Sequence, residues 1–329
     1  MSFLLAALGA VVVAAALYDV LKTTLSAQGG APLTSALSAG LWAILGRGPA
    51  HGLPRRAAGG VILTAVPVAW TLLLWTGWTI VFASADGAVV DASSQTPADL
   101  PARVYFVGFT LFTLGNGDYV PSGGAWQVLT AVASFTGLFL VTLAITYLLP
   151  VVQAVAEKRS LAGRIHSLGA TGVEIAAQAG GPGSSLERQL ESAAADLTLH
   201  AERHLVYPVL HYFASDEART ALAPRLAALS DGLLLLRHGL PEADRPDPTA
   251  LGSVEGALDD YLATVRGSLA SPSEEAPPPP PSAGLDRTAP EADRDLADAA
   301  RQRDDQRRLL RAVVRQSGHD WPGAVGTQS

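Results

Sequence analysis

Three long stretches without a charged side chain constrain this chain more than any other feature. They cover residues 2–18, 57–85 and 119–156 of the 329-residue sequence. About 20 apolar residues cross the hydrocarbon core of a bilayer, where a helix satisfies all of its own backbone polar groups. The first stretch is short, but it continues through Val20 and Leu21 and lacks the basic start of a signal peptide. We therefore expect an all-α membrane protein with three transmembrane helices.

The composition excludes several classes of function. Apolar residues make up 49% of the chain and charged residues 16%, which is less charge than soluble domains usually carry. The chain has no cysteine, so neither a disulfide nor a thiolate metal site can form. A net charge of -7 argues against nucleic-acid binding, which needs a basic face. Ser, His and Asp are scattered without a catalytic motif around them, so we expect no enzyme and no cofactor.

The distribution of charge predicts the orientation in the membrane. Basic residues lie between the first two stretches and after the third, at Lys22, Arg47, Arg55, Arg56, Lys158, Arg159 and Arg164. The connection over residues 86–118 has four aspartates and only Arg103. The positive-inside rule then predicts a multi-pass protein of the cell membrane, with the N-terminus outside and the C-terminus in the cytoplasm. Residues 34–45 are too short to cross, and they are either an interfacial helix or a simple amphipathic connector.

The external connection contains a short apolar segment followed by glycines. Residues 104–114 are apolar but too short to cross a bilayer, and Pro101 precedes them as at a helix start. Gly115-Asn116-Gly117-Asp118 follows directly. A short helix, a Gly-rich segment and then a transmembrane helix is the layout of a re-entrant loop, in which bare backbone lines water or is packed in protein.

These residues resemble the two-transmembrane, pore-loop potassium-channel family over about residues 60–156. The family's filter reads Thr-Val-Gly-Tyr-Gly-Asp, and its carbonyl oxygens replace the hydration shell of the ion. This chain has Thr113-Leu114-Gly115-Asn116-Gly117-Asp118 at the matching place. The resemblance implies a pore domain of outer helix, pore helix, filter and inner helix. It also implies potassium ions bound by residues 113–117 and, since a ring of carbonyls needs four loops, a homotetramer.

The resemblance extends to residues outside the filter. Tyr105 stands where the family usually has a tryptophan that bonds the filter aspartate, so we expect it to brace Asp118. Gly137 lies where the family's inner helix often has a hinge glycine, although a small residue there also permits close helix packing. Pro150 lies near the expected cytoplasmic constriction and can bend the helix.

Two threonines of the expected inner helix have alternative interpretations. Thr142 and Thr146 are four residues apart and so share one helix face. They can line the cavity below the filter, or they can hydrogen-bond to carbonyls of their own helix.

The filter departs from the family pattern at Asn116, where the family has an aromatic residue that bonds to the pore helix. Asparagine is too short to reach as far, which would leave the outer ion sites wider or more mobile. The first hypothesis is therefore a potassium channel, and the alternative is a non-selective monovalent cation channel that also passes sodium. A non-conducting membrane receptor or scaffold is a further alternative. No predicted transmembrane helix carries repeated arginines, so a voltage sensor of that kind is not expected.

The rest of the chain is predicted to be helical and cytoplasmic. Ser184 and Glu187 form a capping box that starts a helix to about residue 206, Ser215-Asp216-Glu217 cap a second to about His238, and a third covers about 248–269. No strand–Gly-x-Gly-x-x-Gly–helix unit for a nucleotide is evident. The expected domains are a transmembrane helix at 1–25, a cytoplasmic linker at 26–56, the pore domain at 57–156, a cytoplasmic helical domain at 157–270, and a Pro-rich linker with a disordered tail at 271–329.

Two further features could bind partners. Five consecutive prolines, Pro277 to Pro281, form a linker or a segment that binds a protein partner. His200 and His204 have the i,i+4 spacing of a helical metal pair and could also sense pH, or they are ordinary half-buried histidines. Residues 291–316 alternate acidic and basic side chains, which predicts a solvated helix or coil.

Overall fold

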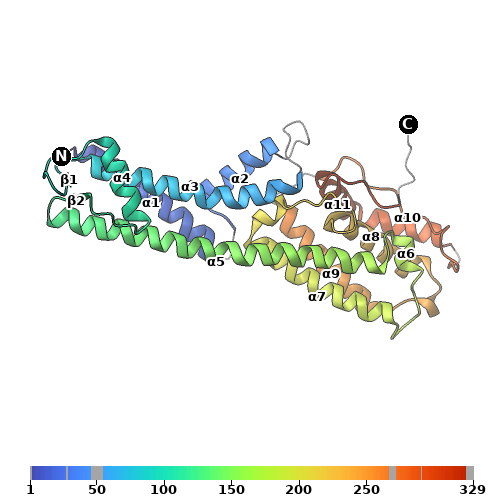
Figure 1. The fold of residues 1–329 in the computed structure, drawn as a ribbon. Coiled ribbons are helices and arrows are strands. Elements are labelled where there is room, and N and C mark those ends of the chain that lie inside the picture. The colour runs from blue at the N-terminus through green and yellow to red at the C-terminus, as the bar shows by residue number, and fades with distance from the viewer. Residues whose placement is uncertain (1, 27–28, 46–54, 267–271, 290, 324–329) are drawn as a thin grey trace. The chain divides into compact units, whose positions relative to one another are not determined.

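The computed structural model describes residues 2–26, 29–45, 55–266, 272–289 and 291–323 (Figure 1). The chain divides into two compact units. The first, which we call the membrane unit, comprises residues 1–47 and 60–151. The second, the helical unit, comprises residues 48–59 and 152–329. Arg47 and residues 267–269 of the expected third C-terminal helix lie outside the described residues.

Three long apolar helices confirm the predicted transmembrane segments. They are α1 (Phe3–Leu25), α3 (Arg55–Ala83) and α5 (Gly124–Leu168). Each contains an apolar window long enough to cross a bilayer. Among the described residues the strands are limited to two short ones, so the fold is all-α as expected. Two shorter apolar helices, α2 (Pro32–Leu45) and α4 (Leu100–Leu111), complete the membrane unit.

Helices α1 and α3 cross at two glycines. A Cβ atom at Gly9 would lie 2.7 Å from the backbone nitrogen of Val81, and one at Gly77 would lie 3.0 Å from the backbone nitrogen of Val13. Neither contact could be relieved by a side-chain rotation, because backbone atoms are involved. Lipid tails are as apolar as the helix faces, so close backbone packing of this kind holds membrane helices together.

A buried carboxylate joins α1, α2 and α3. Asp19 is 1% exposed, and its oxygens accept the backbone N–H groups of Leu33 (3.0 Å) and Thr34 (3.2 Å) at the start of α2. They also accept the Thr34 hydroxyl (2.6 Å) and the indole N–H of Trp70 on α3 (2.8 Å). Asp19 therefore caps α2 from another helix, since the first N–H groups of α2 have no partner within α2. The segment expected to be an interfacial helix or a connector is a helix that packs on α1.

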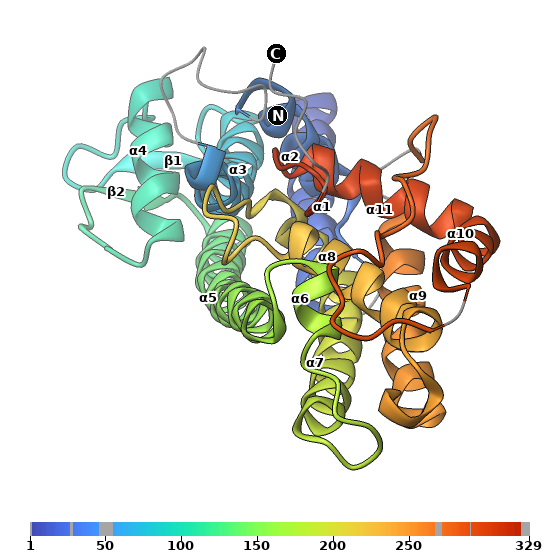
Figure 2. The same ribbon diagram turned by 90° about the vertical axis from the view of Figure 1, so that its right-hand side faces the viewer.

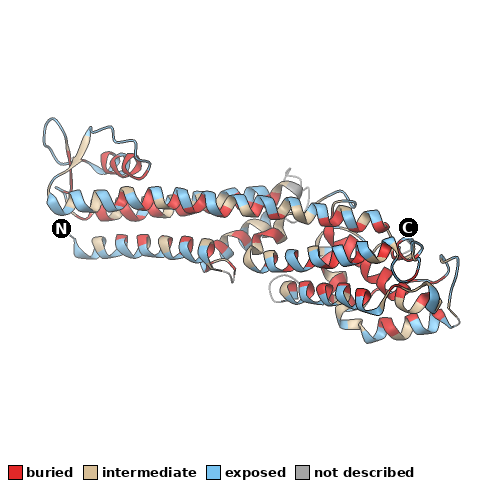
Figure 3. Ribbon diagram, turned by 90° about the horizontal axis from the view of Figure 1, so that it is seen from below, coloured by how far each residue is buried: buried red, intermediate tan, exposed pale blue. Residues whose placement is uncertain are grey.

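The helical unit is a group of amphipathic helices around one apolar core (Figure 2). After α5 it contains α6 (Gly172–Ala176), α7 (Ser185–Val206), η2 (Pro208–Tyr212), α8 (Leu222–Leu234), η3 (Leu235–Gly239), η4 (Glu242–Asp244), α9 (Pro248–Arg266), α10 (Ala292–Gln302) and α11 (Asp304–Gln316). Helix α7 packs along α9, and α8 lies at the centre with nearly every residue buried. Buried positions gather along the inward faces of these helices (Figure 3).

The predicted caps of the helical unit are correct for one helix and wrong for another. The Ser184 hydroxyl accepts the N–H of Glu187 (3.3 Å) at the start of α7, while the Glu187 carboxylate accepts the N–H of Gly183 (3.2 Å) instead of that of Ser184. The second helix begins at Leu222 and not at Ser215, because the Ser215 hydroxyl bonds the Thr220 hydroxyl (2.6 Å) within a turn.

The expected disordered tail differs from the structure over residues 291–316. The apolar residues of α10 and α11 recur at helical spacing, and Leu296, Leu309 and Leu310 are buried in the core. Charge alternation along the sequence predicted only a solvated face and missed this apolar stripe.

The proline segment is held by the chain itself. Arg307, which is 1% exposed, donates to the carbonyl of Pro278 (2.8 Å) and to the carboxylate of Asp231 on α8 (2.6 Å). Arg311 of the same helix donates to the carbonyl of Ala276 (3.1 Å). The segment expected to be a linker or a site for a protein partner therefore packs along α11.

Candidate functional site

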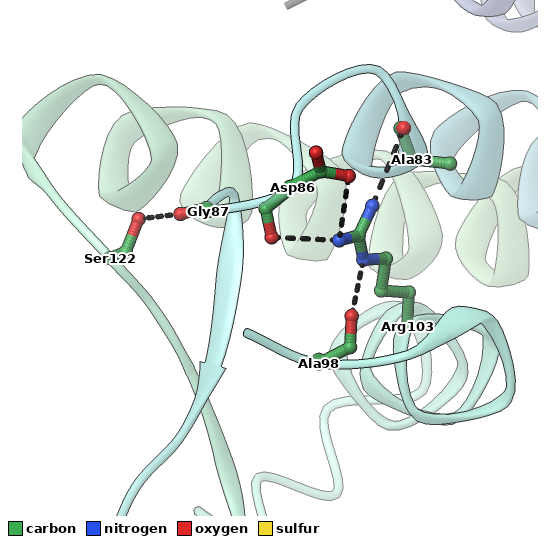
Figure 4. A network of polar contacts seen from close by, with 6 residues as sticks. All are labelled: Ala83, Asp86, Gly87, Ala98, Arg103 and Ser122. Carbon is green, nitrogen blue, oxygen red and sulfur yellow. Dashed lines mark hydrogen bonds and ion pairs between the residues drawn. The ribbon is translucent and has the colours of Figure 1, made fainter. Parts of the chain in front are cut away.

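The short helix α4 is fixed at its start by one arginine. The carboxylate of Asp99 accepts the N–H of Ala102 (2.9 Å) as an N-cap, and Pro101 occupies the first turn. Arg103 is 7% exposed, and it donates to the carbonyls of Ala98 (2.9 Å) and Asp86 (2.7 Å) (Figure 4). The Asp86 carboxylate lies 3.9 Å from the same guanidinium. Arg103 thus ties the start of α4 to the turn that follows α3.

A two-stranded ladder holds the far end of the loop. Strand β1 (Val89–Asp91) pairs antiparallel with β2 (Tyr119–Pro121), with Val90 opposite Val120. The N–H of Ala92 donates to the carbonyl of Asp118 (2.9 Å), which extends this pairing to the last residue of the loop. Figure 4 also shows Ser122 donating to the carbonyl of Gly87. Three-residue strands give almost no periodic signal, so this ladder could not be predicted from the sequence.

The backbone between α4 and β2 alternates in conformation. Thr113, Gly115 and Gly117 have φ angles of 56°, 59° and 80°, while Leu114 and Asn116 stay out of the left-handed region. Glycine adopts positive φ without cost, whereas for a β-branched residue such as Thr113 it is a strained outlier that costs ~1–3 kcal/mol and is found mainly at functional sites. Alternation of this kind can turn successive carbonyl groups to one side of the chain.

The C-terminal end of α4 leads directly into this alternating segment. The N–H of Leu114 donates to the carbonyl of Phe109 (2.8 Å), so the helix closes at the first residues of the loop. The C-terminus of a helix carries a partial negative charge of ~0.5 electron, which favours a cation nearby. Residues 112–118 are exposed in the single chain, and Leu114 is 64% exposed. The loop therefore places an exposed backbone segment next to the negative end of α4.

The expected brace between Tyr105 and Asp118 is present, and it has a third member. The Tyr105 hydroxyl donates to the Asp118 carboxylate at 3.4 Å, and the Asn116 amide donates to the Tyr105 hydroxyl. Asn116 is a short side chain, and it meets α4 because the longer Tyr105 side chain extends toward the loop. That the outer ion sites are wider or more mobile stays a prediction. The contact between Asn116 and Tyr105 could not be predicted, because the two residues lie eleven positions apart in the sequence.

Aromatic residues of α3, outside the predicted site residues, pack against α4. The indole N–H of Trp75 on α3 donates to the carbonyl of Val104 (2.9 Å), and a Cβ atom at Gly108 would lie 2.7 Å from the Trp75 ring. The rings of Phe82 and Phe106 pack edge to face, 5.2 Å apart.

Gly137 lies against the end of α4. A Cβ atom there would lie 2.8 Å from the carbonyl carbon of Leu111 and closer still to its oxygen. This contact favours the packing interpretation of Gly137 over the hinge interpretation. Helix α5 is continuous over Gly137 and Pro150.

The two threonines on α5 bond to their own helix. The Thr142 hydroxyl donates to the carbonyl of Leu138 (3.0 Å) and the Thr146 hydroxyl to that of Leu143 (2.9 Å). Both side chains are exposed in the single chain. The second of the two interpretations is therefore observed, and cavity lining stays a prediction.

The two histidines of α7 lie in the helical unit and are buried. His200 and His204 are 4% and 3% exposed, and both rings contact Tyr261 on α9. Burial and the positive charge of Lys158 lower the pKa of His200 to about 3 and that of His204 to about 4. Among the described residues no group of three or more His, Asp or Glu side chains could hold a metal ion. The pair therefore lacks the further ligands that a metal site needs, and the nearby lysine disfavours a cation.

Two transmembrane helices that enclose a short helix and a Gly-rich, re-entrant backbone segment define the pore domain of an ion channel. The sequence model of a family described as "Ion channel" matches residues 68–154, which include most of α3, all of α4, the loop and much of α5. The chain belongs to this ion-channel family and is a membrane protein.

One relative is similar along nearly the whole chain. It is the protein named "Uncharacterized membrane protein YdjJ" of Bacillus subtilis (strain 168), which is 31% identical over 323 residues. The match covers 95% of this chain and 94% of that protein, so it includes the helical unit as well as the pore domain. No solved structure matches the chain.

Proposed function

We propose that the protein is a homotetrameric, potassium-conducting channel whose filter is residues 113–117. The observation that carries the proposal is the left-handed conformation at Thr113, Gly115 and Gly117, directly after the C-terminus of α4. In a filter of this kind, backbone carbonyl oxygens replace the hydration shell of a monovalent cation. The negative end of the α4 dipole adds to the attraction.

Four copies are proposed because one chain supplies one loop. A carbonyl ring closes around an axis only when several loops meet, and cyclic symmetry is the usual way for identical chains to do so. The exposure of residues 112–118 in the single chain supports this arrangement, since the segment has room for neighbouring subunits. The mass of the purified protein in mild detergent tests it: four chains are expected, and a monomer or dimer would contradict a closed pore.

Potassium is the first candidate ion, and a non-selective channel is the second because of Asn116. The hydrogen bond from Asn116 to Tyr105 supports an ordered, potassium-selective outer filter. The small size of the Asn116 side chain supports a wider, non-selective filter. The variant Asn116→Tyr separates the two candidates. A sharper preference for potassium over sodium would assign the selectivity to this side chain, and unchanged sodium permeability would show that Asn116 does not set it.

Charge asymmetry supports a cell-membrane location with the N-terminus outside and the helical unit in the cytoplasm. Helix α5 contributes its residues up to 151 to the membrane unit and those from 152 to the helical unit. A continuous helix of this kind could transmit a rearrangement of the helical unit to the pore. The helical unit is accordingly proposed to regulate opening or assembly.

Ion-dependent stability tests the proposal in detergent. An ion that binds only the folded filter stabilises the protein, by about 2.7 kcal/mol at a concentration 100 times its Kd. We expect the thermal unfolding temperature to rise when N-methylglucamine is replaced by potassium. The rise should vanish in Gly115→Ala, because position 115 needs positive φ, and persist in Gly124→Ala, where a Cβ atom meets nothing within 4 Å. No effect of any monovalent cation on the wild-type protein would count against the filter.

A further inference from the structure

The membrane unit contains a groove away from the pore loop. It has a volume of about 370 Å³ and is formed by α2 and α3, with Asp19 of α1 at one side. Its apolar lining consists of Leu33, Leu37, Val66, Ala69, Leu72 and Leu73. This volume lies within the ~300–1,000 Å³ range of sites that hold small molecules.

Most polar groups at the groove are already engaged. The Asp19 carboxylate accepts N–H and O–H groups of Leu33, Thr34 and Trp70, which use its lone pairs within the protein. A charged ligand would find no free partner at these residues, and Thr76 adds a single hydroxyl to the lining. The groove therefore selects its occupant mainly by apolar character and shape.

The length of the groove indicates the kind of apolar molecule. Its lining on α3 extends from Val66 to Thr76, which is ten residues or ~15 Å along a helix that rises ~1.5 Å per residue. The hydrocarbon core of a bilayer is ~30 Å thick, so this length equals about one leaflet. Both α1 and α3 are long and apolar enough to cross the membrane, which makes hydrocarbon the surrounding medium.

We propose that this groove binds one acyl chain of a membrane phospholipid. The chain lies along α3 beside Ala69 and Leu73 and covers the joint at which Asp19 holds the start of α2. The lipid thereby stabilises the packing of α1, α2 and α3. This inference is independent of the ions that the pore conducts.

The test uses a phosphatidylcholine with a photoactivatable diazirine on its acyl chain. The full-length protein is reconstituted in vesicles that contain this lipid, illuminated, digested and mapped by mass spectrometry. Labels on the wild-type protein should concentrate on residues 69–76 of α3 and 33–37 of α2. Labels spread over the exposed faces of all the transmembrane helices, in proportion to exposure, would overturn the proposal even if no variant could be purified.

A matched pair of variants then tests the groove itself. Ala69→Phe fills it, whereas Val68→Phe adds a similar bulk at a neighbouring position that is 52% exposed and does not line it. Ala69→Phe should lower labelling of α2 by about tenfold, which corresponds to ~1.4 kcal/mol of lost binding. Val68→Phe should leave it unchanged. Equal labelling of α2 in both variants would contradict the assignment.

A second copy of the chain is the competing occupant. Because the chain has no cysteine, Ala69→Cys introduces a single thiol. Under oxidising conditions in the membrane, the proposal predicts monomeric bands on a denaturing gel, since lipid separates the grooves. Efficient disulfide-linked dimers would show that protein covers the groove and would overturn the lipid assignment.

Discussion

Replacing Gly137 by alanine distinguishes a packing glycine from a hinge. A methyl group at position 137 would lie 2.8 Å from the carbonyl carbon and 2.9 Å from the Cα atom of Leu111. Ordinary carbon contacts lie near 3.5–4.0 Å. Because the opposing atoms are backbone, α5 and the end of α4 must separate by several tenths of an ångström or more. Overpacking of this kind costs about 1–3 kcal/mol.

Gly163→Ala on the same helix is the matched control. A Cβ atom at Gly163 meets nothing within 4 Å, so this change should add only the helix propensity of alanine, about 1 kcal/mol. Both variants share this gain, so their difference isolates the steric cost at Gly137. We expect Gly137→Ala to be less stable than Gly163→Ala by about 1–3 kcal/mol.

Thermal unfolding of the purified protein and ion flux in vesicles are the two assays. Gly137→Ala should unfold at a lower temperature than Gly163→Ala and should lose flux, because the displaced end of α4 carries the alternating segment. If Gly137→Ala were as stable as Gly163→Ala and lost flux only, Gly137 would be a hinge and the packing argument would be refuted.

Three further predictions concern other contacts. Tyr105→Phe removes the hydroxyl that bonds Asn116 and Asp118, and it should reduce potassium selectivity in flux assays without changing the oligomer. His200 and His204 have pKa values lowered to about 3 and about 4, so the unfolded state binds their protons first as pH falls below 6.5. Each should cost about 2 kcal/mol of unfolding free energy at pH 5 relative to neutral pH. Replacing both by leucine should make this part of a stability profile shallower, although not flat, because burial also lowers the pKa of His211 to about 3; an equally steep profile would refute the assignment. Arg307→Ala leaves the buried carboxylate of Asp231 without its cation and should destabilise the helical unit by about 3–5 kcal/mol in thermal unfolding.

The transmembrane helices and the loop could be predicted because their signals are local. A long uncharged stretch satisfies its backbone polar groups in a bilayer only as a helix. Gly115 and Gly117 mark positions at which the backbone can adopt positive φ without steric cost. The apolar segment at residues 104–114, with a helix start expected at Pro101, contributes to α4 at Leu100–Leu111, which Asp99 caps.

Features that depend on distant partners could not be predicted. In the sequence, Asp19 only marks the end of an uncharged stretch. Its role as a cap of α2 could not be predicted, because the chain folds back so that Leu33, fourteen residues later, lies beside it. The bond between Asn116 and Tyr105 has the same origin. The burial of Leu309 and Leu310 was hidden by the surrounding charges, because the core that accepts α11 is built by other helices. The sequence of a helix indicates which of its faces is apolar, but the elements that pack against that face depend on the tertiary fold.

Ion flux through the purified protein in liposomes decides whether residues 113–117 form a conducting filter. Vesicles contain potassium or sodium as the only permeant cation, and wild type is compared with Gly115→Ala and Gly124→Ala. We expect potassium flux in wild type and Gly124→Ala and its loss in Gly115→Ala, since of these two glycines only Gly115 has a left-handed backbone. Absence of flux for both cations in wild type, or equal flux in Gly115→Ala, would contradict the assignment of residues 113–117 as a conducting filter.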